Sequence, residues 1–130
     1  MNRQLGISLI AAALAGPLPA LAHHSFAMFD QTKEVILKDA TVKEWQWTSP
    51  HTWLYVFVPN GSSTPDKSSI EGGNPGILRR QGFGIGSMKP GDKVTVYIHP
   101  LKSGEKGGSL YGVVLADGKT LGTTVNEQAQ

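Results

Sequence analysis

The chain has 130 residues, which suits one domain, and its 39% hydrophobic and 17% charged residues are typical of a folded globular protein. Lys and Arg number 12 and Asp and Glu 10, so the net charge of +2 is too small for the cationic surface that nucleic-acid binding requires. The absence of cysteine excludes disulfides, thiolate metal sites, a cysteine nucleophile and a lipid anchor on cysteine.

The first 22 residues have the pattern of an export signal. Arg3 gives a positive start, residues 5–14 form an apolar run, and Ala20-Leu21-Ala22 supplies the small residues of a cleavage site. The run is shorter than the ~20 residues that span a bilayer, and a retained anchor or a buried helix is the alternative. We therefore expect cleavage after Ala22, a periplasmic or secreted location, and no membrane insertion of the mature chain.

The remaining residues divide into three parts. Residues 23–33 are expected to form an extended N-terminal arm. Residues 34–122 carry the strand and turn patterns of one β domain, and residues 123–130 are expected to form a flexible tail.

The first strand is expected over residues 34–47, which are rich in β-branched and aromatic side chains. The apolar residues of this segment occupy both parities, and a bulge midway would explain the switch from one face to the other. Residues 51–58 predict a second strand that is apolar on both faces, and residues 68–71 predict a short third strand.

A short helix is expected to begin at Asn74-Pro75, because asparagine caps free amide groups and proline suits the first helical position. Gly82 is placed to end this helix. Apolar and polar residues alternate over 94–99, which predicts a half-buried fourth strand, and residues 110–115 predict a fifth.

This order of elements indicates the fold class. Five strands with one short helix between strands 3 and 4, and a long coiled first strand, are the layout of a small OB-like barrel. We therefore expect a mainly β fold of this type. A small β-sandwich or an open meander is the alternative.

The histidines are the candidate metal ligands: His23, His24, His51 and His99. Cleavage after Ala22 would make His23 the N-terminus, where the α-amino group and the imidazole can chelate a metal ion together. A second imidazole would complete the T-shaped arrangement that copper favours. His24 can instead bind through the amine, a peptide nitrogen and its ring, and solvated histidines on a loose arm are the alternative.

Either of the two later histidines can supply that second imidazole. His51 begins the second predicted strand, where it can orient a ligand, bind a metal or cap backbone carbonyls. His99 lies on the face of the fourth strand opposite the apolar residues, so it is available as a distal ligand to the arm.

An aromatic group on neighbouring strands is the candidate site for a ligand other than metal. It consists of Trp45, Trp47, Trp53 and Tyr55, with Phe57 beside them. On an OB-like barrel such a face can stack sugars or bases. The alternative is packing in the core, because each ring buries a large apolar area.

Catalytic patterns are sparse. The carboxylates have no spacing that pairs them as acid and base, and no nucleophile elbow surrounds Ser25. The glycine-rich segment 82–86 lacks the Lys-Ser/Thr ending of a phosphate loop. The sequence therefore favours a binding module over an enzyme.

Several short motifs together resemble a family of small exported bacterial proteins that is classified as a domain of unknown function. They are the start His23-His24-Ser25-Phe26, the segments Ser49-Pro50-His51-Thr52-Trp53 and Leu78-Arg79-Arg80-Gln81-Gly82-Phe83, and the turn Lys89-Pro90-Gly91-Asp92. The resemblance covers essentially the whole mature chain. It implies export and a compact β-barrel-like domain, and it assigns no activity or catalytic residue.

Two functions follow as hypotheses. The first is a periplasmic binding module that holds copper through His23 and His24 with His51 or His99. The second is an accessory OB-like module that binds a small ligand or a protein partner through the aromatic group, without metal. A metal-dependent oxidase is a third hypothesis, for which the sequence predicts no substrate pocket.

Overall fold

The computed structural model describes residues 24–124. The expected signal peptide over residues 1–22, His23, and most of the expected tail, residues 125–130, lie outside the described residues. The elements follow in chain order: α1 (His24–Ala27), β1 (Val35–Gln46), β2 (Trp53–Val58), β3 (Asp66–Glu71), α2 (Pro75–Arg80), β4 (Lys93–Pro100), β5 (Gly107–Leu115) and β6 (Thr120–Gly122).

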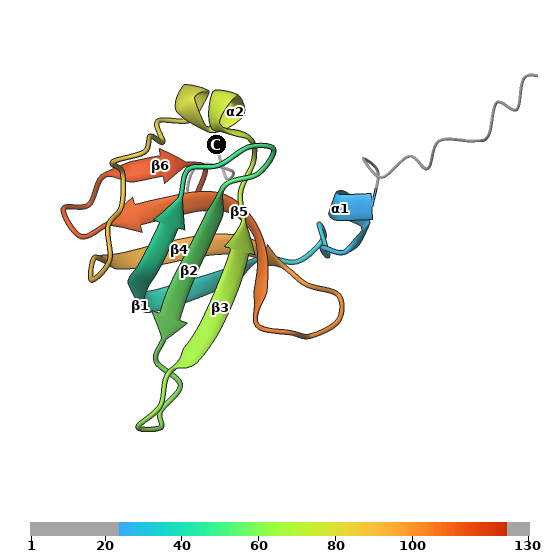
Figure 1. Cartoon of the computed structure of the whole chain (residues 1–130). Helices are drawn as coiled ribbons and strands as arrows, with labels where there is room; N and C mark the ends of the chain where they lie inside the picture. Colours follow the sequence, from blue (N-terminus) through green and yellow to red (C-terminus); the bar gives the residue numbers. More distant parts are fainter. Residues whose placement is uncertain (1–23, 125–130) are drawn as a thin grey trace, which may run out of the picture.

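The strands close into a barrel, as Figure 1 shows. Neighbouring strands follow the order β3-β2-β1-β4-β5-β6, and a parallel pairing of β3 with β5 joins the two sides of the sheet. Strands β1 to β5 therefore form a closed five-stranded barrel, with α2 between β3 and β4. The prediction of a mainly β, OB-like barrel with one short helix at this position is confirmed.

The long first strand, β1, pairs with a strand on each side because it bends within its length. Its first half pairs with β4 and its second half with β2. The register shifts between Leu37 and Ala40 against β4, and between Val42 and Glu44 against β2. Asp39 in the first shift has a φ of 53°. These bulges explain the change of apolar parity seen in the sequence.

The core fills the barrel interior with side chains from every strand of the barrel. Leu54 and Val56 of β2, Ile70 of β3, Val96 of β4 and Val113 of β5 are each at most 1% exposed. At one end of the barrel, the core continues into α2 and the loop after it. The residues that extend it there are Leu78, Phe83 and Met88.

Strand β6 was not among the five expected strands. It pairs with the end of β5, and its Leu121 is 1% exposed. Three residues ending in glycine are too short to show an alternating pattern, so only the Asp117-Gly118 turn indicated that the chain folds back here.

The arm ahead of β1 contains one helical turn, α1, and is attached to the barrel by its backbone. Phe29 forms a β-bridge with Leu101 and is 5% exposed. The amide of Asp30 donates to the Pro100 carbonyl at 2.8 Å, and the amide of Lys102 donates to the Met28 carbonyl at 2.9 Å. The arm is thereby held beside the end of β4. Across residues 24–124, no helix is both long and apolar enough to cross a bilayer.

Candidate functional site

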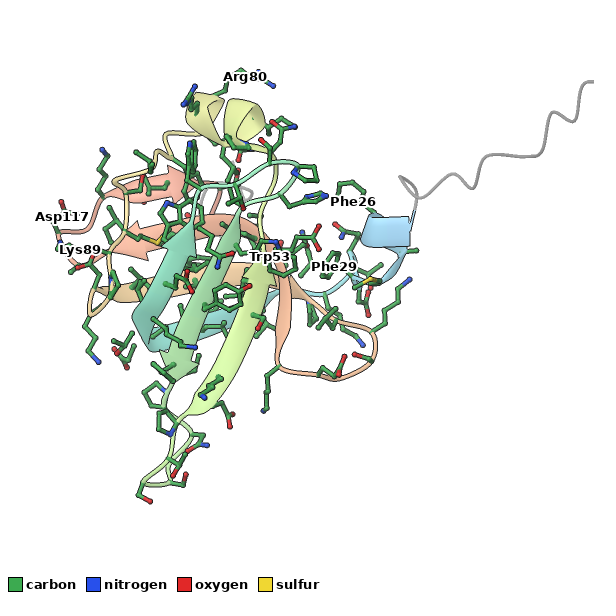
Figure 2. The ribbon with its side chains drawn as sticks, in the orientation of Figure 1. Phe26, Phe29, Trp53, Arg80, Lys89 and Asp117 are labelled. Carbon is green, nitrogen blue, oxygen red and sulfur yellow. The ribbon has the colours of Figure 1, made fainter. Side chains whose placement is uncertain are left out.

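A cleft of about 290 Å³ lies where the arm meets the barrel. Figure 2 shows Phe26 and Phe29 between α1 and the barrel, on one side of this region. The other walls come from His51 just before β2, the end of β3, α2, and the neighbouring strands β4 and β5. The polar residues that line the cleft are Gln31, His51, Glu71, Gln81, His99, Ser109 and Tyr111.

The register of the barrel places four of the residues around this region in one row across the strands. Trp53 of β2 pairs with Glu71 of β3, Glu71 pairs with Ser109 of β5, and Ser109 pairs with His99 of β4. Neighbouring strands are about 4.8 Å apart, so the backbones of Glu71 and His99 are separated by about 10 Å. Barrel closure through β3 and β5 therefore brings together residues that are distant in the sequence.

His51 stands just before β2 and is held by the end of β3. Its Nδ1 atom lies 3.1 Å from Oε1 of Glu71 and 3.3 Å from the Gly72 carbonyl oxygen. The Glu71 side chain is 13% exposed, whereas that of His51 is 37% exposed. A carboxylate and a carbonyl can only accept hydrogen bonds, so the proton of the neutral ring is on Nδ1 and Nε2 keeps its lone pair.

His99 is held in a similar way by the arm. Its Nδ1 atom lies 2.8 Å from the carbonyl oxygen of Lys33, which again places the ring proton on Nδ1. The ring packs against Tyr111, with centroids 4.8 Å apart. In the neutral form, both histidines of the cleft therefore have the lone pair on Nε2.

Tyr111 reaches His99 because of a bulge in β5. Tyr97 pairs with Gly112 and Ile98 pairs with Leu110, so Tyr111 is the extra residue between them. Burial raises the pKa of Tyr111 to about 12, and the Glu34 carboxylate adds to this shift. The Glu34 side chain acts on this pKa both by its charge and as a hydrogen-bond partner, although among residues 24–124 no group has good hydrogen-bond geometry to the buried hydroxyl.

The structure brings together two of the four predicted metal ligands, His51 and His99, in the walls of one cleft. His24 is the first residue of α1, two positions before Phe26, and His23 lies outside the described residues. Within the described part of the chain, no group of three or more His, Cys, Asp or Glu side chains is close enough to hold a metal ion.

The predicted aromatic group is divided between two faces of the barrel. Trp45 and Trp47, with centroids 5.7 Å apart, pack against the core, and Nε1 of Trp45 donates to the Gly84 carbonyl at 2.9 Å. Trp53 and Tyr55 alternate with the buried residues of β2, so they lie on the outer face, where their rings stack with centroids 6.2 Å apart. The four rings thus do not form one surface.

Sequence reasoning missed Glu71 as the partner of His51. The two residues are 20 positions apart, and no motif spacing connects them. Their neighbourhood could have been found from the hairpin: when β2 and β3 pair around the loop at residues 59–65, the segment just before β2 lies beside the end of β3. Tyr111 was missed because a bulge decides on which side of β5 its side chain lies. The alternation of apolar and polar residues in the sequence does not reveal that bulge.

Comparison with known proteins gives a family and no function. The chain matches the family of unknown function (DUF6152) over residues 11–110. Neither the curated proteins nor the solved structures contain a significant match.

Proposed function

The chain belongs to this family of unknown function, and we propose that it is an exported binding module that holds a copper ion at the cleft beside His51 and His99. In this proposal the signal peptide is removed after Ala22, in the periplasm or on secretion. The amine and imidazole of His23 then bind the ion, His24 is the alternative ligand of the same segment, and an imidazole of the cleft completes the site.

The convergence of His51 and His99 is the observation that carries the proposal. They lie far apart in the sequence, His51 before β2 and His99 near the end of β4, yet both line the cleft beside the arm. Each has its Nδ1 atom occupied by an oxygen acceptor. Metal-binding histidines are oriented in this way, because a partner on one ring nitrogen fixes the lone pair on the other.

The distance from the N-terminus to the cleft also supports the proposal. Phe26 lines the cleft, and His23 precedes it by three residues, which span at most about 10 Å. A mature amine at His23 is therefore within reach of the cleft. Amine and imidazole nitrogens are donors that suit copper among the divalent metals of the first transition row.

The experiment combines the mass of the exported protein with a Cu(II) titration followed by EPR. We expect a chain that begins at His23 and binds one copper ion with a nitrogen-rich spectrum. His23→Ala should weaken binding by more than about 100-fold, because losing a ligand costs more than the roughly 10- to 100-fold loss that follows removal of a ligand's hydrogen-bond partner. A chain acetylated at the His23 amine is the matched control, since it keeps every imidazole and removes only the amine donor. Equal binding by that chain, or a different N-terminus, would contradict the proposal.

The stacked pair Trp53 and Tyr55 favours a second candidate function, the binding of a small ligand on the outer face of β2. Their rings are nearly parallel, inclined by 15°, on the outer face of β2, and outward-facing aromatic rings can stack a flat ligand such as a sugar ring. Tryptophan fluorescence during titration with neutral oligosaccharides would test this function. Trp53→Ala should abolish the response, and copper should leave it unchanged.

A further inference from the structure

We propose that Glu71 is the positioning residue of the copper site, and that it makes His51 the cleft ligand in preference to His99. This inference rests on the proposed function and names the residues that control it. The sequence alone offered His51 or His99 as the cleft ligand, and the inference selects His51.

The first step is the orientation of the His51 ring. Glu71 is only 13% exposed, and its Oε1 atom lies 3.1 Å from Nδ1 of His51. Because the carboxylate can only accept from this nitrogen, it selects the tautomer whose lone pair is on Nε2. The side chain of His51 is 37% exposed and lines the cleft, so a metal ion can reach the ring.

The second step is the difference between the partners of the two histidines. His99 donates to a neutral backbone carbonyl, that of Lys33, while His51 donates to a carboxylate. A charged acceptor makes a hydrogen bond about twice as strong as a neutral one, and it increases the electron density on the ligating nitrogen. His99 is also covered on one side by Tyr111. His51 is therefore the stronger ligand.

The experiment measures Cu(II) binding of the processed protein by titration and EPR in single and double variants. We expect Glu71→Ala to weaken binding by about 10- to 100-fold. Glu71→Gln should weaken it less, because the amide oxygen still accepts from Nδ1 while the charge is lost. His51→Ala should weaken binding more than His99→Ala. Glu44→Gln is the matched control, since it removes the same charge from β1 outside the cleft lining.

Two readouts separate positioning from a general loss of structure. Glu71→Ala should have no further effect on affinity in a His51→Ala background, because Glu71 acts through His51. In the metal-free protein, ¹⁵N NMR of the imidazoles should show His51 protonated on Nδ1, and Glu71→Ala should convert it to a mixture of tautomers.

The outcomes distinguish this inference from the proposed function. Wild-type copper affinity in Glu71→Ala, or an equal effect of that change in the His51→Ala background, overturns the role of Glu71 alone. Wild-type affinity in His23→Ala together with weak binding in Glu71→Ala overturns the N-terminal ligand and supports the role of Glu71. A processed wild-type protein that takes up no copper overturns both.

Discussion

At the scale of single residues, Tyr111 is the side chain whose surroundings fit it least. Its hydroxyl is buried, and within residues 24–124 it makes no hydrogen bond of good geometry, with the Glu34 carboxylate beside it as a poorly aligned acceptor. A desolvated hydroxyl with so poor a partner costs up to about 1–3 kcal/mol of stability. The phenol also resists ionisation, since burial and then the Glu34 charge raise its pKa from 10.0 to about 12.

The Tyr111→Phe variant should therefore be at least as stable as the wild type near neutral pH. It should also lose less stability in alkali. Above about pH 10 the unfolded wild type releases the Tyr111 proton while the folded protein keeps it, so folding becomes less favourable until about pH 12. Denaturant unfolding at about pH 8 and about pH 11 measures both effects. Tyr55→Phe is the control, and the alkaline loss due to Tyr111 should remain in it.

At the scale of elements, helix α2 depends on its cap. Oδ1 of Asn74 accepts from the Ile77 amide at 2.9 Å, and Pro75 follows in the first turn. Six residues are too few for a helix to be stable by itself, so the cap and the burial of Leu78 must hold it. Both Ile77 and Leu78 line the cleft, which makes the cap relevant to the site.

Asn74→Ala should lower the free energy of unfolding by about 1 kcal/mol, the usual effect of losing an N-cap. Thermal or urea unfolding measures the change. Asn74→Asp keeps an acceptor at the same position and should stay close to the wild type. A similar loss in both variants would show that the capping bond is not the stabilising interaction.

The arm is a second element whose attachment can be tested. Phe29 is 5% exposed, whereas Phe26 on the same arm is 72% exposed. Phe29→Ala should release the arm, because the buried ring packs the arm against the barrel beside its backbone hydrogen bonds to Pro100 and Lys102. Hydrogen exchange should then accelerate at the Asp30 and Lys102 amides and remain slow in the centre of β4. Phe26→Ala is the matched control and should leave the exchange unchanged.

The elements could be predicted where a local pattern determines them. The alternation of residues 94–99 corresponds to β4, and Asn74-Pro75 marks the start of α2. The parity switch in residues 34–47 indicated the bulges of β1. The cleft could not be predicted in the same way. His51 meets Glu71 through the pairing of β2 with β3, and His99 meets Tyr111 through the pairing of β4 with β5. The two pairs come together only through the closing pairing of β3 with β5, which no spacing in the chain reveals.

At the scale of the whole molecule, closure depends on how near β5 can approach two other strands. The start of β5 pairs with the end of β4 and also, in parallel, with β3. Gly108 lies in both pairings, opposite Pro100 on one side and Ile70 on the other. A Cβ atom at Gly108 would overlap the carbonyl oxygen of His99. Glycine is therefore required here by the close approach of two backbones.

Gly108→Ala should lower the free energy of unfolding by about 1–3 kcal/mol, because β4 or β5 must move to admit the methyl group. The displaced strand would carry His99 away from the Lys33 carbonyl, so the variant should also disturb the cleft. Denaturant unfolding gives the first effect, and the ¹⁵N resonances of the His99 ring give the second. Gly86→Ala is the matched control, since no described atom lies within 4 Å of its Cβ position, and it should change stability by less than about 1 kcal/mol. Equal stability of the two variants would mean that the barrel closes with more freedom than the pairing of β3 with β5 implies.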